Sequence, residues 1–453
     1  MSFLSELGYG SLAELVSVNR KFEAHGNPLT PAYRYHKRLH EEQEQMLIET
    51  GLKSLYPDMK KFYLEQQHVH GTANKRMIEA IRSNPYIDGY CVHALTGGDW
   101  ILGAGLLDLW RNPKSYAYEA TKAANQPRII SVRTIPRNVY AEHGMSLKIT
   151  GINDVENVAA NYEVSIQSKD GNEVFRNNFK SDWKTGISSL FNKKINTEKW
   201  SGYYTVRVKV RDQRFQVLTE NFIDFEVFNQ EDLKAPTGKV AVLDFKGHLK
   251  NFLKKNNLKN VDFNSNTPRD VPVLVSTHKA ENDDELKRFK LLLKFVESGG
   301  TAVYLDRLTD SVKIENTITP FTTRVHPSKG LWTCIPHIAK EHPILEGLQN
   351  NGFLRNSYEN IWPKKSLRDL KVNGVRVKEK PLVASIAFDW FSRGHKMGYS
   401  GPGPSWWGAD MTFVSFKKGQ YLLSQFELLE NLGKDPVADR ILFNIIRFFN
   451  AKD

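Results

Sequence analysis

The hydrophobic periodicity of this chain changes twice along its 453 residues, and these changes limit the folds open to it. Residues 11–124 carry apolar side chains mainly at helical spacing. Within Lys60–Arg82, for example, Met77, Ile78 and Ile81 lie opposite charged side chains. Residues 129–228 instead alternate between polar and apolar over short segments separated by turn residues. From residue 239 onward, apolar strands alternate with amphipathic helices. The sequence therefore predicts three successive units that are helix-rich, antiparallel β and α/β.

The middle unit begins after Pro127 and ends in a linker at Gln230–Gly238, which contains the turn-forming run Ala-Pro-Thr-Gly. Turn signals such as Asp170-Gly171-Asn172 separate its short segments. Alternating strands at this spacing over about 100 residues predict an antiparallel β-sandwich that resembles an immunoglobulin-like domain, at residues 128–232. The predicted strands are Ile129–Val132, Ser146–Ile152, Asn161–Gln167, Tyr203–Val210 and Phe222–Phe228.

The third unit reads as a parallel sheet with helices on both faces, because its strands and helices alternate. Gly299-Gly300 is the expected stop of its longest helix. The predicted strands are Lys239–Asp244, Val271–Ser276, Thr301–Leu305 and Gly419–Gln425, and the predicted helices are Leu249–Asn256, Asp283–Ser298 and Pro436–Asn450.

Composition argues against several partners and cofactors. The formal charge is +12, but the lysines are scattered over amphipathic segments and no nucleic-acid-binding motif accompanies them. Only two cysteines occur, Cys91 and Cys334, so neither a disulfide framework nor a metal cluster is expected. No run of about 18 apolar residues is present. We therefore expect no nucleic-acid partner, no membrane partner, no metal and no cofactor.

Several linked motifs in the first unit occur in a diagnostic order. Ser5-Glu6-Leu7-Gly8 stands first, and a long helical segment follows that ends near Asn84-Pro85. The stretch from Gly89-Tyr90 to Lys114 then reads GYCVHALTGGDWILGAGLLDLWRNPK. This order resembles glycoside hydrolase family two, the group of β-galactosidases, β-mannosidases, β-glucuronidases and exo-glucosaminidases. The resemblance implies that residues 1–127 are the C-terminal portion of a TIM (β/α)₈ barrel, comprising its seventh and eighth strands.

The same resemblance assigns Glu6 as the nucleophile of a retaining mechanism. Such a mechanism needs a second carboxyl group about 5 Å away as acid/base. The family supplies that group from an Asn-Glu pair upstream of the nucleophile, and only five residues precede Glu6. Asn172-Glu173 is instead predicted to lie in a hairpin turn. The chain is thus expected to be a fragment that holds the nucleophile, lacks the acid/base and is inactive unless an upstream-encoded chain completes the barrel.

Four further residues are candidates for substrate binding. Relatives commonly place a tryptophan in the eighth strand, where this chain has His93, and Trp100 follows a few residues later. Trp100 could stack on a sugar face and Asp99 could accept from its hydroxyl groups. Tyr9 is expected to point into the same site. The alternatives are that Trp100 packs under its loop and that His93 is a core histidine.

The third unit, residues 237–453, resembles the class I glutamine amidotransferase-like fold, a doubly wound, flavodoxin-like domain. The resemblance rests on Lys239–Asp244, FVESGGTAVYL at Phe295–Leu305 and HPILEGL at His342–Leu348. A working amidotransferase needs a nucleophilic cysteine on a strand-to-helix turn. The chain has Thr277-His278 after the corresponding strand, and Cys334 stands far from any glycine-flanked turn. This domain is expected to be non-catalytic.

Taken together, the sequence predicts a retaining β-glycosidase that hydrolyses terminal sugars of oligo- or polysaccharides. Its expected partners are a carbohydrate substrate, a chain that completes the barrel and further copies in an oligomer. The alternative is a non-catalytic assembly or carbohydrate-binding module with a vestigial barrel segment. The sequence does not identify the sugar or the compartment, although relatives are typically secreted or periplasmic.

Overall fold

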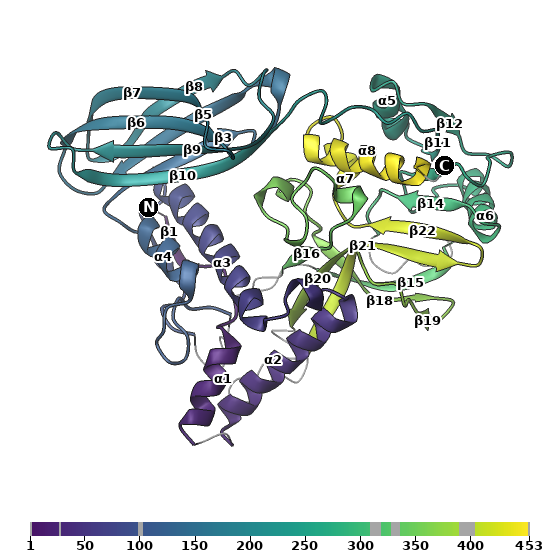
Figure 1. Ribbon diagram of the computed structural model, residues 1–453, viewed down its shortest axis with the longest axis horizontal. Helices are drawn as coiled ribbons and strands as arrows, with labels where there is room; N and C mark the ends of the chain where they lie inside the picture. Colours follow the sequence, from purple (N-terminus) through teal and green to yellow (C-terminus); the bar gives the residue numbers. More distant parts are fainter. Residues whose placement is uncertain are drawn as a thin grey trace.

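The protein is a mixed α/β and β-rich multidomain molecule, seen here in a computed structural model (Figure 1). The structure describes residues 2–26, 29–97, 103–308, 319–327, 336–388 and 404–451. Two packed sheets of mostly antiparallel strands lie at the upper left of Figure 1, a large mixed sheet with helices lies at the right, and the N-terminal helices run below. None of the described helices is long and apolar enough to cross a membrane.

The N-terminal region contains a parallel pair of strands connected through helices. Strands β1 (Phe3–Leu7) and β2 (Gly89–Val92) pair in parallel. The predicted helix at Lys60–Arg82 is confirmed as α3 (Met59–Arg82), which Asp58 caps by accepting a hydrogen bond from the Lys60 amide at 2.8 Å. Leu7 packs against side chains of α3 and of α4 (Ser115–Ala124), so these two helices cover one face of the strand pair. The remaining helices are α1 (Leu15–Ala24), α2 (Pro31–Thr50) and the 3₁₀ turn η1 (Lys53–Leu55).

The middle region consists of two sheets packed face to face, whose strands pair antiparallel except that the edge strand β4 pairs with β10 in parallel. One sheet has the order β4-β10-β9-β6-β7 and the other has the order β3-β5-β8, and Trp183 and Tyr162 lie buried between them. All five predicted strands are confirmed. Strands β7 and β8 were not predicted, because they are edge strands with few buried side chains. The prediction that Glu173 lies in a hairpin turn is wrong, because the turn ends at Asn172 and Glu173 is the first residue of β7. The strands are β3 (Arg128–Ile135), β4 (Asn138–Tyr140), β5 (Met145–Asn153), β6 (Val158–Ser168), β7 (Glu173–Trp183), β8 (Gly186–Ile195), β9 (Gly202–Arg211) and β10 (Val217–Phe228), with the 3₁₀ turn η2 (Ala141–His143).

The C-terminal region is built on a sheet that starts parallel and continues antiparallel. Its parallel part has the order β12-β11-β13-β14-β22. Helices α5 and α8 pack into the core on one face, and α6 packs into the core on the other. The predicted helix Pro436–Asn450 is confirmed as α8.

The sequence did not predict the antiparallel extension of this sheet. Its strand β21 pairs with β22, β20 and β18. The C-terminal elements are β11 (Val240–Leu243), α5 (His248–Lys255), β12 (Asn260–Asp262), β13 (Val273–Val275), α6 (Asp283–Glu297), β14 (Thr301–Tyr304), β15 (Phe321–Pro327), β16 (His337–Ala339), η3 (Pro343–Leu345), β17 (Gly352–Phe353), η4 (Asn356–Tyr358), β18 (Lys365–Val372), β19 (Val375–Arg376), β20 (Val383–Phe388), β21 (Ser405–Phe416), β22 (Gly419–Ser424), α7 (Leu428–Asn431) and α8 (Pro436–Asn450).

The N-terminal helices share a hydrophobic core with this C-terminal sheet. Leu39 and Leu47 of α2 lie in one buried cluster with Ile338 of β16 and Ile386 of β20. At the edge of the cluster, the Trp407 indole nitrogen donates to a Glu49 carboxylate oxygen at 2.8 Å. The segment that contains α1 and α2 therefore packs the N-terminal region against the C-terminal sheet.

Candidate functional site

The parallel pairing places Glu6 and His93 at one edge of the strand pair. Leu7 lies opposite Val92, and the His93 amide donates to the Leu7 carbonyl at 2.8 Å. Both strands therefore end at the same edge, with Glu6 one residue before the end of β1 and His93 directly after β2. In (β/α)₈ enzymes, this carboxyl-terminal edge of the strands carries the catalytic groups.

Gly8 allows the two strand ends to approach closely. A β-carbon at this position would lie 2.5 Å from the His93 carbonyl oxygen, which is closer than any side chain tolerates. The residue after the strand must therefore be glycine for the backbones of β1 and β2 to keep this spacing. The glycine of the Ser-Glu-Leu-Gly motif thus has a physical role in placing Glu6 beside β2.

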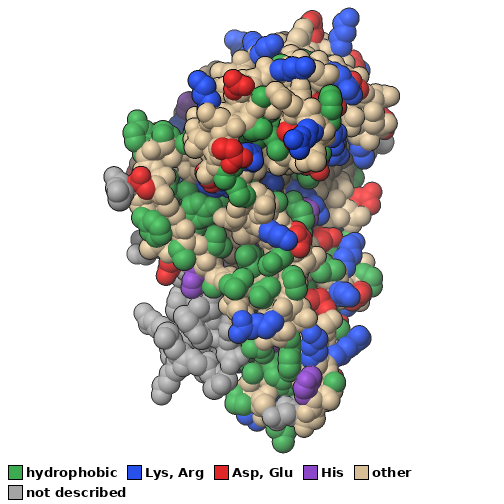
Figure 2. Space-filling view, turned by 90° about the vertical axis from the view of Figure 1, so that its left-hand side faces the viewer, with side chains coloured by type: hydrophobic (Ala, Val, Ile, Leu, Met, Phe, Trp, Pro, Cys, Tyr) green, Lys and Arg blue, Asp and Glu red, His purple; other side chains and the backbone are tan. Residues whose placement is uncertain are grey.

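The face of the strand pair opposite α3 and α4 is open. Glu6 is exposed, and Phe3 on the same strand is 65% exposed. Tyr86, just before β2, is 82% exposed. Figure 2, which views the molecule from the left-hand side of Figure 1, shows hydrophobic side chains gathered over the middle of that side. Parallel strands are normally covered on both faces, so an exposed face on a parallel pair is unusual.

Three polar residues on one face of α3 hold the loop that follows Glu6. Gln67, His70 and Asn74 have the spacing i, i+3 and i+7, and all three are buried. The Asn74 Oδ1 atom accepts from the Tyr9 amide at 2.7 Å, and His70 Nδ1 lies 3.0 Å from the Ser11 hydroxyl oxygen. Gln67 Nε2 donates to the Leu12 carbonyl oxygen at 3.2 Å. The loop is therefore fixed almost residue by residue.

Lys114 fixes the same loop from its other side. Its ammonium group donates to the carbonyl oxygens of Ser11 at 2.7 Å, Ala104 at 3.1 Å and Gly103 at 3.2 Å. Lys114 is only 2% exposed, and burial lowers its pKa to about 7. Burial, together with the nearby Lys114 ammonium, lowers the pKa of His70 well below its usual range. Lys114 therefore ties the loop after β1 to the loop that precedes α4.

The three polar residues of α3 were not predicted from the sequence. The available signal was that polar side chains recur at helical spacing on a face that also carries Phe62 and Ile78, both buried. Among the predicted site residues, the structure brings Glu6, Tyr9 and His93 to one edge. Asp99 and Trp100 lie outside the described residues.

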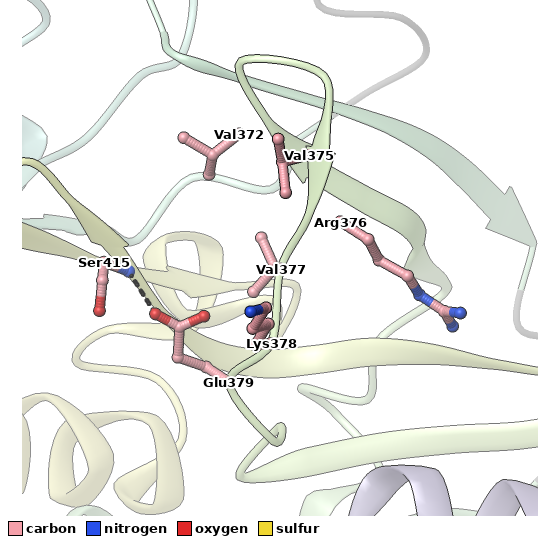
Figure 3. A pocket seen from close by; sticks show the side chains of 7 residues that line it. All are labelled: Val372, Val375, Arg376, Val377, Lys378, Glu379 and Ser415. Atoms are coloured by element: carbon pink, nitrogen blue, oxygen red, sulfur yellow. Dashed lines mark hydrogen bonds between the residues drawn. The ribbon is translucent and has the colours of Figure 1, made fainter.

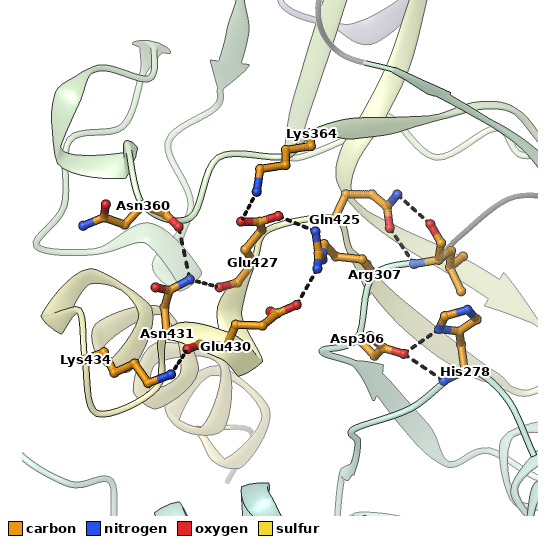
Figure 4. A network of polar contacts seen from close by, with 11 residues as sticks. His278, Asp306, Arg307, Asn360, Lys364, Gln425, Glu427, Glu430, Asn431 and Lys434 are labelled. Carbon is orange, nitrogen blue, oxygen red and sulfur yellow. Dashed lines mark hydrogen bonds and ion pairs between the residues drawn. The ribbon is translucent and has the colours of Figure 1, made fainter. Parts of the chain in front are cut away.

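The C-terminal region has its own polar cluster at the carboxyl ends of parallel strands (Figure 4). His278 follows β13, and its Nδ1 atom lies 2.5 Å from a carboxylate oxygen of Asp306, which follows β14. Arg307 binds Glu427 and Glu430. The segment after β13 therefore leads into a histidine that is paired with a carboxylate. Cys334 lies outside the described residues, and Cys91 is on β2.

A pocket of about 510 Å³ lies beside the β18–β19 hairpin (Figure 3). Three valines line it together with charged side chains, and Glu379 accepts from the Ser415 amide at its rim. It contains none of the predicted site residues, and the β18–β19 hairpin beside it lies on the opposite side of Figure 1 from β1. The candidate site is thus separate from this pocket.

Comparison with known proteins gives partial matches. No protein-family model and no curated protein sequence matches the chain. Among solved structures, an exo-chitosanase of Amycolatopsis orientalis has 15% identity and a TM-score of 0.29, covering 35% of this chain, which spans only 19% of that enzyme. A Bacteroides uniformis β-glucuronidase has 13% identity and a TM-score of 0.18, covering 39% of this chain and 33% of its own. The C-terminal domain of wzt has 10% identity and a TM-score of 0.19, and the match covers 23% of this chain and 75% of that domain. TM-scores of this size reflect local similarity rather than a shared overall fold.

Proposed function

We propose that this chain is the nucleophile-bearing part of a retaining β-glycosidase that hydrolyses terminal sugars of oligo- or polysaccharides. The observation that carries the proposal is the parallel pairing of β1 and β2, which sets Glu6 beside His93 at the carboxyl-terminal edge. The Ser-Glu-Leu-Gly motif and the motifs around Gly89–Lys114 support the same family. In this proposal, β1 and β2 are the seventh and eighth strands of a (β/α)₈ barrel.

The chemistry assigned to Glu6 is nucleophilic. Its carboxylate attacks the anomeric carbon while a second carboxylic acid protonates the departing glycosidic oxygen, which leaves a glycosyl ester on Glu6. That second group, now a carboxylate, then takes a proton from water as the water attacks the anomeric carbon and releases Glu6. Tyr9, His93, Asp99 and Trp100 are assigned to sugar binding. The acid/base residue is assigned to the barrel strands that lie outside this chain.

The other two regions are assigned supporting roles. We infer that residues 128–232 form an immunoglobulin-like sandwich and that residues 237–453 form a flavodoxin-like, class I glutamine amidotransferase-like domain without catalytic activity. The parallel strands of the C-terminal sheet have the chain order 2-1-3-4-5, which is the order of doubly wound flavodoxin-like folds. Among the described residues, β13 is followed by Ser276, Thr277 and His278 rather than by a cysteine, which supports the lack of catalytic activity.

Activity is expected only when the remaining barrel strands are supplied. The test is hydrolysis of a panel of p-nitrophenyl β-glycosides by the chain alone and by the chain co-expressed with the product encoded immediately upstream. Loss of general acid catalysis alone lowers rates by about 10² to 10⁴-fold, so the isolated chain should show no turnover above background. Turnover by the co-expressed pair supports the proposal. A pair that associates stably yet cleaves no β-glycoside contradicts it.

The second candidate is a non-catalytic assembly or carbohydrate-binding module with a vestigial barrel segment, acting in an oligomer. The core shared by α2, β16 and β20 favours it, because that core gives the N-terminal helices a structural purpose independent of catalysis. The DNA upstream of the coding sequence distinguishes the two candidates. An upstream reading frame that encodes further barrel strands favours the enzyme. Unrelated upstream sequence favours the module.

A further inference from the structure

A group of buried polar side chains lies where the sandwich meets the C-terminal domain. From strand β4, the Asn138 amide nitrogen donates to the Ser357 carbonyl at 2.7 Å and to the carboxylate of Asp435 at 3.0 and 3.1 Å. From the end of the same strand, the Tyr140 hydroxyl donates to a carboxylate oxygen of Asp439 at 2.8 Å. Asp435 and Asp439 belong to the first turn of α8 and its cap. The junction is therefore made by hydrogen bonds to acidic side chains.

Glu226 of β10 adds a third carboxyl group to this junction. It is 3% exposed, and its Oε2 atom is buried without a hydrogen-bond partner among the described residues. The groups that face it are the hydroxyls of Tyr203 and Ser357 and, at longer range, the carboxylates of Asp232 and Asp435. A buried carboxylate in such surroundings has no cation beside it to offset its lost hydration.

The remaining charged groups around the junction do not neutralise Glu226. Lys255 of α5 lies near Asp439 and favours its ionised form. Arg137 and Arg76 both form ion pairs with Glu359. Asn360 donates to Asp435 at 2.8 Å. The two arginines are therefore paired with Glu359, and the one lysine acts on Asp439, so neither kind of cation is paired with Glu226.

Burial raises the pKa of all three carboxyl groups. The pKa of Glu226 rises to about 8 and that of Asp439 to about 6, and that of Asp435 is also raised. An acid whose pKa is raised in the closed junction binds its proton more tightly there than when exposed. Its contribution to the closed state is fully present below the ordinary carboxyl pKa and is lost as the pH rises through the raised value.

We propose that this junction is a pH-sensitive contact, in which protonated Glu226 and Asp439 keep the sandwich docked on α8 and η4 and their ionisation loosens it. The proposal is independent of the glycosidase assignment, because none of these residues belongs to the candidate site. The ion pair of Arg82 with Asp154 and the hydrogen bond of Lys75 to Asn221 hold the sandwich to α3 at a second place. The contact with the C-terminal domain can therefore open without detaching the sandwich from the rest of the chain.

Hydrogen exchange of the full chain between pH 5 and pH 8.5 tests the proposal. After correction for intrinsic exchange rates, the opened population measured in peptides covering residues 138–140, 356–360 and 435–439 should rise with pH. One proton of difference between the two states gives up to about a tenfold rise per pH unit. Peptides of the sandwich core, such as β5, should stay equally protected.

Glu226→Gln is the decisive variant, because it keeps the shape and removes the ionisation. It should flatten most of the pH dependence at the junction, and Asp439→Asn should flatten the part below about pH 6. Glu220→Gln, an exposed carboxylate on the same strand that pairs with Lys209, is the matched control and should keep the wild-type profile. Junction protection that does not change with pH in the wild type overturns the proposal, and so does an unaltered profile in both Glu226→Gln and Asp439→Asn.

Discussion

Replacing Glu6 by alanine should remove β-glycosidase turnover by the completed enzyme, with a fall in kcat/KM of roughly 10⁴-fold or more, because the group that forms the covalent intermediate is lost. The measurement is the hydrolysis of an activated aryl β-glycoside by the co-expressed pair. Added azide is small enough to occupy the vacated space and should restore turnover. It attacks from the face that Glu6 used, so the product should be a glycosyl azide of inverted configuration.

The matched control for this prediction is Glu41→Gln, an exposed carboxylate on α2 outside the site. It should leave turnover unchanged. A Glu6→Ala variant that folds with its partner and keeps wild-type turnover would show that another group is the nucleophile. An azide product of retained configuration would assign Glu6 to the acid/base role instead.

Lys114→Met should destabilise the folded chain by about 2 to 4 kcal/mol, measured by urea unfolding at pH 7. Methionine keeps the length of the side chain but leaves the carbonyls of Ser11 and Ala104 without this donor, whereas the Gly103 carbonyl still accepts from the Ser11 amide at 2.9 Å. Each buried group left without a partner costs about 1 to 3 kcal/mol, and relief from burying the ammonium offsets part of the sum. Lys122→Met, at an exposed position on α4, should change the free energy of unfolding by less than about 0.5 kcal/mol.

Lys114 also makes the free energy of unfolding depend on pH. Its pKa of about 7 in the folded chain lies below the ordinary value of 10.5, so the unfolded chain binds more protons between these two values. The wild type should therefore gain stability relative to Lys114→Met as the pH rises from 7 toward 10. Equal stabilities of the two proteins at pH 7, with parallel pH profiles, would show that the buried ammonium does not support the loop after Glu6.

Much of the fold is predictable where one face of an element is buried. Helix α3 and strands β5, β6, β9 and β10 carry apolar residues with a clear period, and each was found within a few residues of its predicted position. Edge strands are harder, since β8 contains polar residues such as Asn192, Lys193 and Lys194 that face solvent. The same pattern is typical of a loop.

Local sequence patterns did not predict which distant segments of the chain pair with one another. The antiparallel extension through β18, β20 and β21 joins segments far apart in the chain, and the Asn373-Gly374 turn predicts only the short hairpin of β18 with β19. The shared core of α2 with β16 and β20 arises in the same way, because an amphipathic helix does not specify which surface it covers.

The candidate site was predictable in part. The Ser-Glu-Leu-Gly motif indicates Glu6, but it does not indicate the side chains that hold the loop after Glu6. Asn74, His70 and Lys114 act through contacts across 65, 59 and 103 residues, which become visible only in three dimensions.

The most direct test of the central claim is covalent labelling of Glu6. The chain, alone and co-expressed with the upstream product, would be incubated with 2-fluoro-substituted glycosyl inactivators of several sugar types, digested and examined by mass spectrometry. We predict a glycosyl adduct on Glu6 in the co-expressed sample, with the reactive sugar identifying the substrate class. A folded, associated sample with no adduct under any inactivator, or with an adduct on a different carboxylate, would contradict the assignment of Glu6 as the nucleophile.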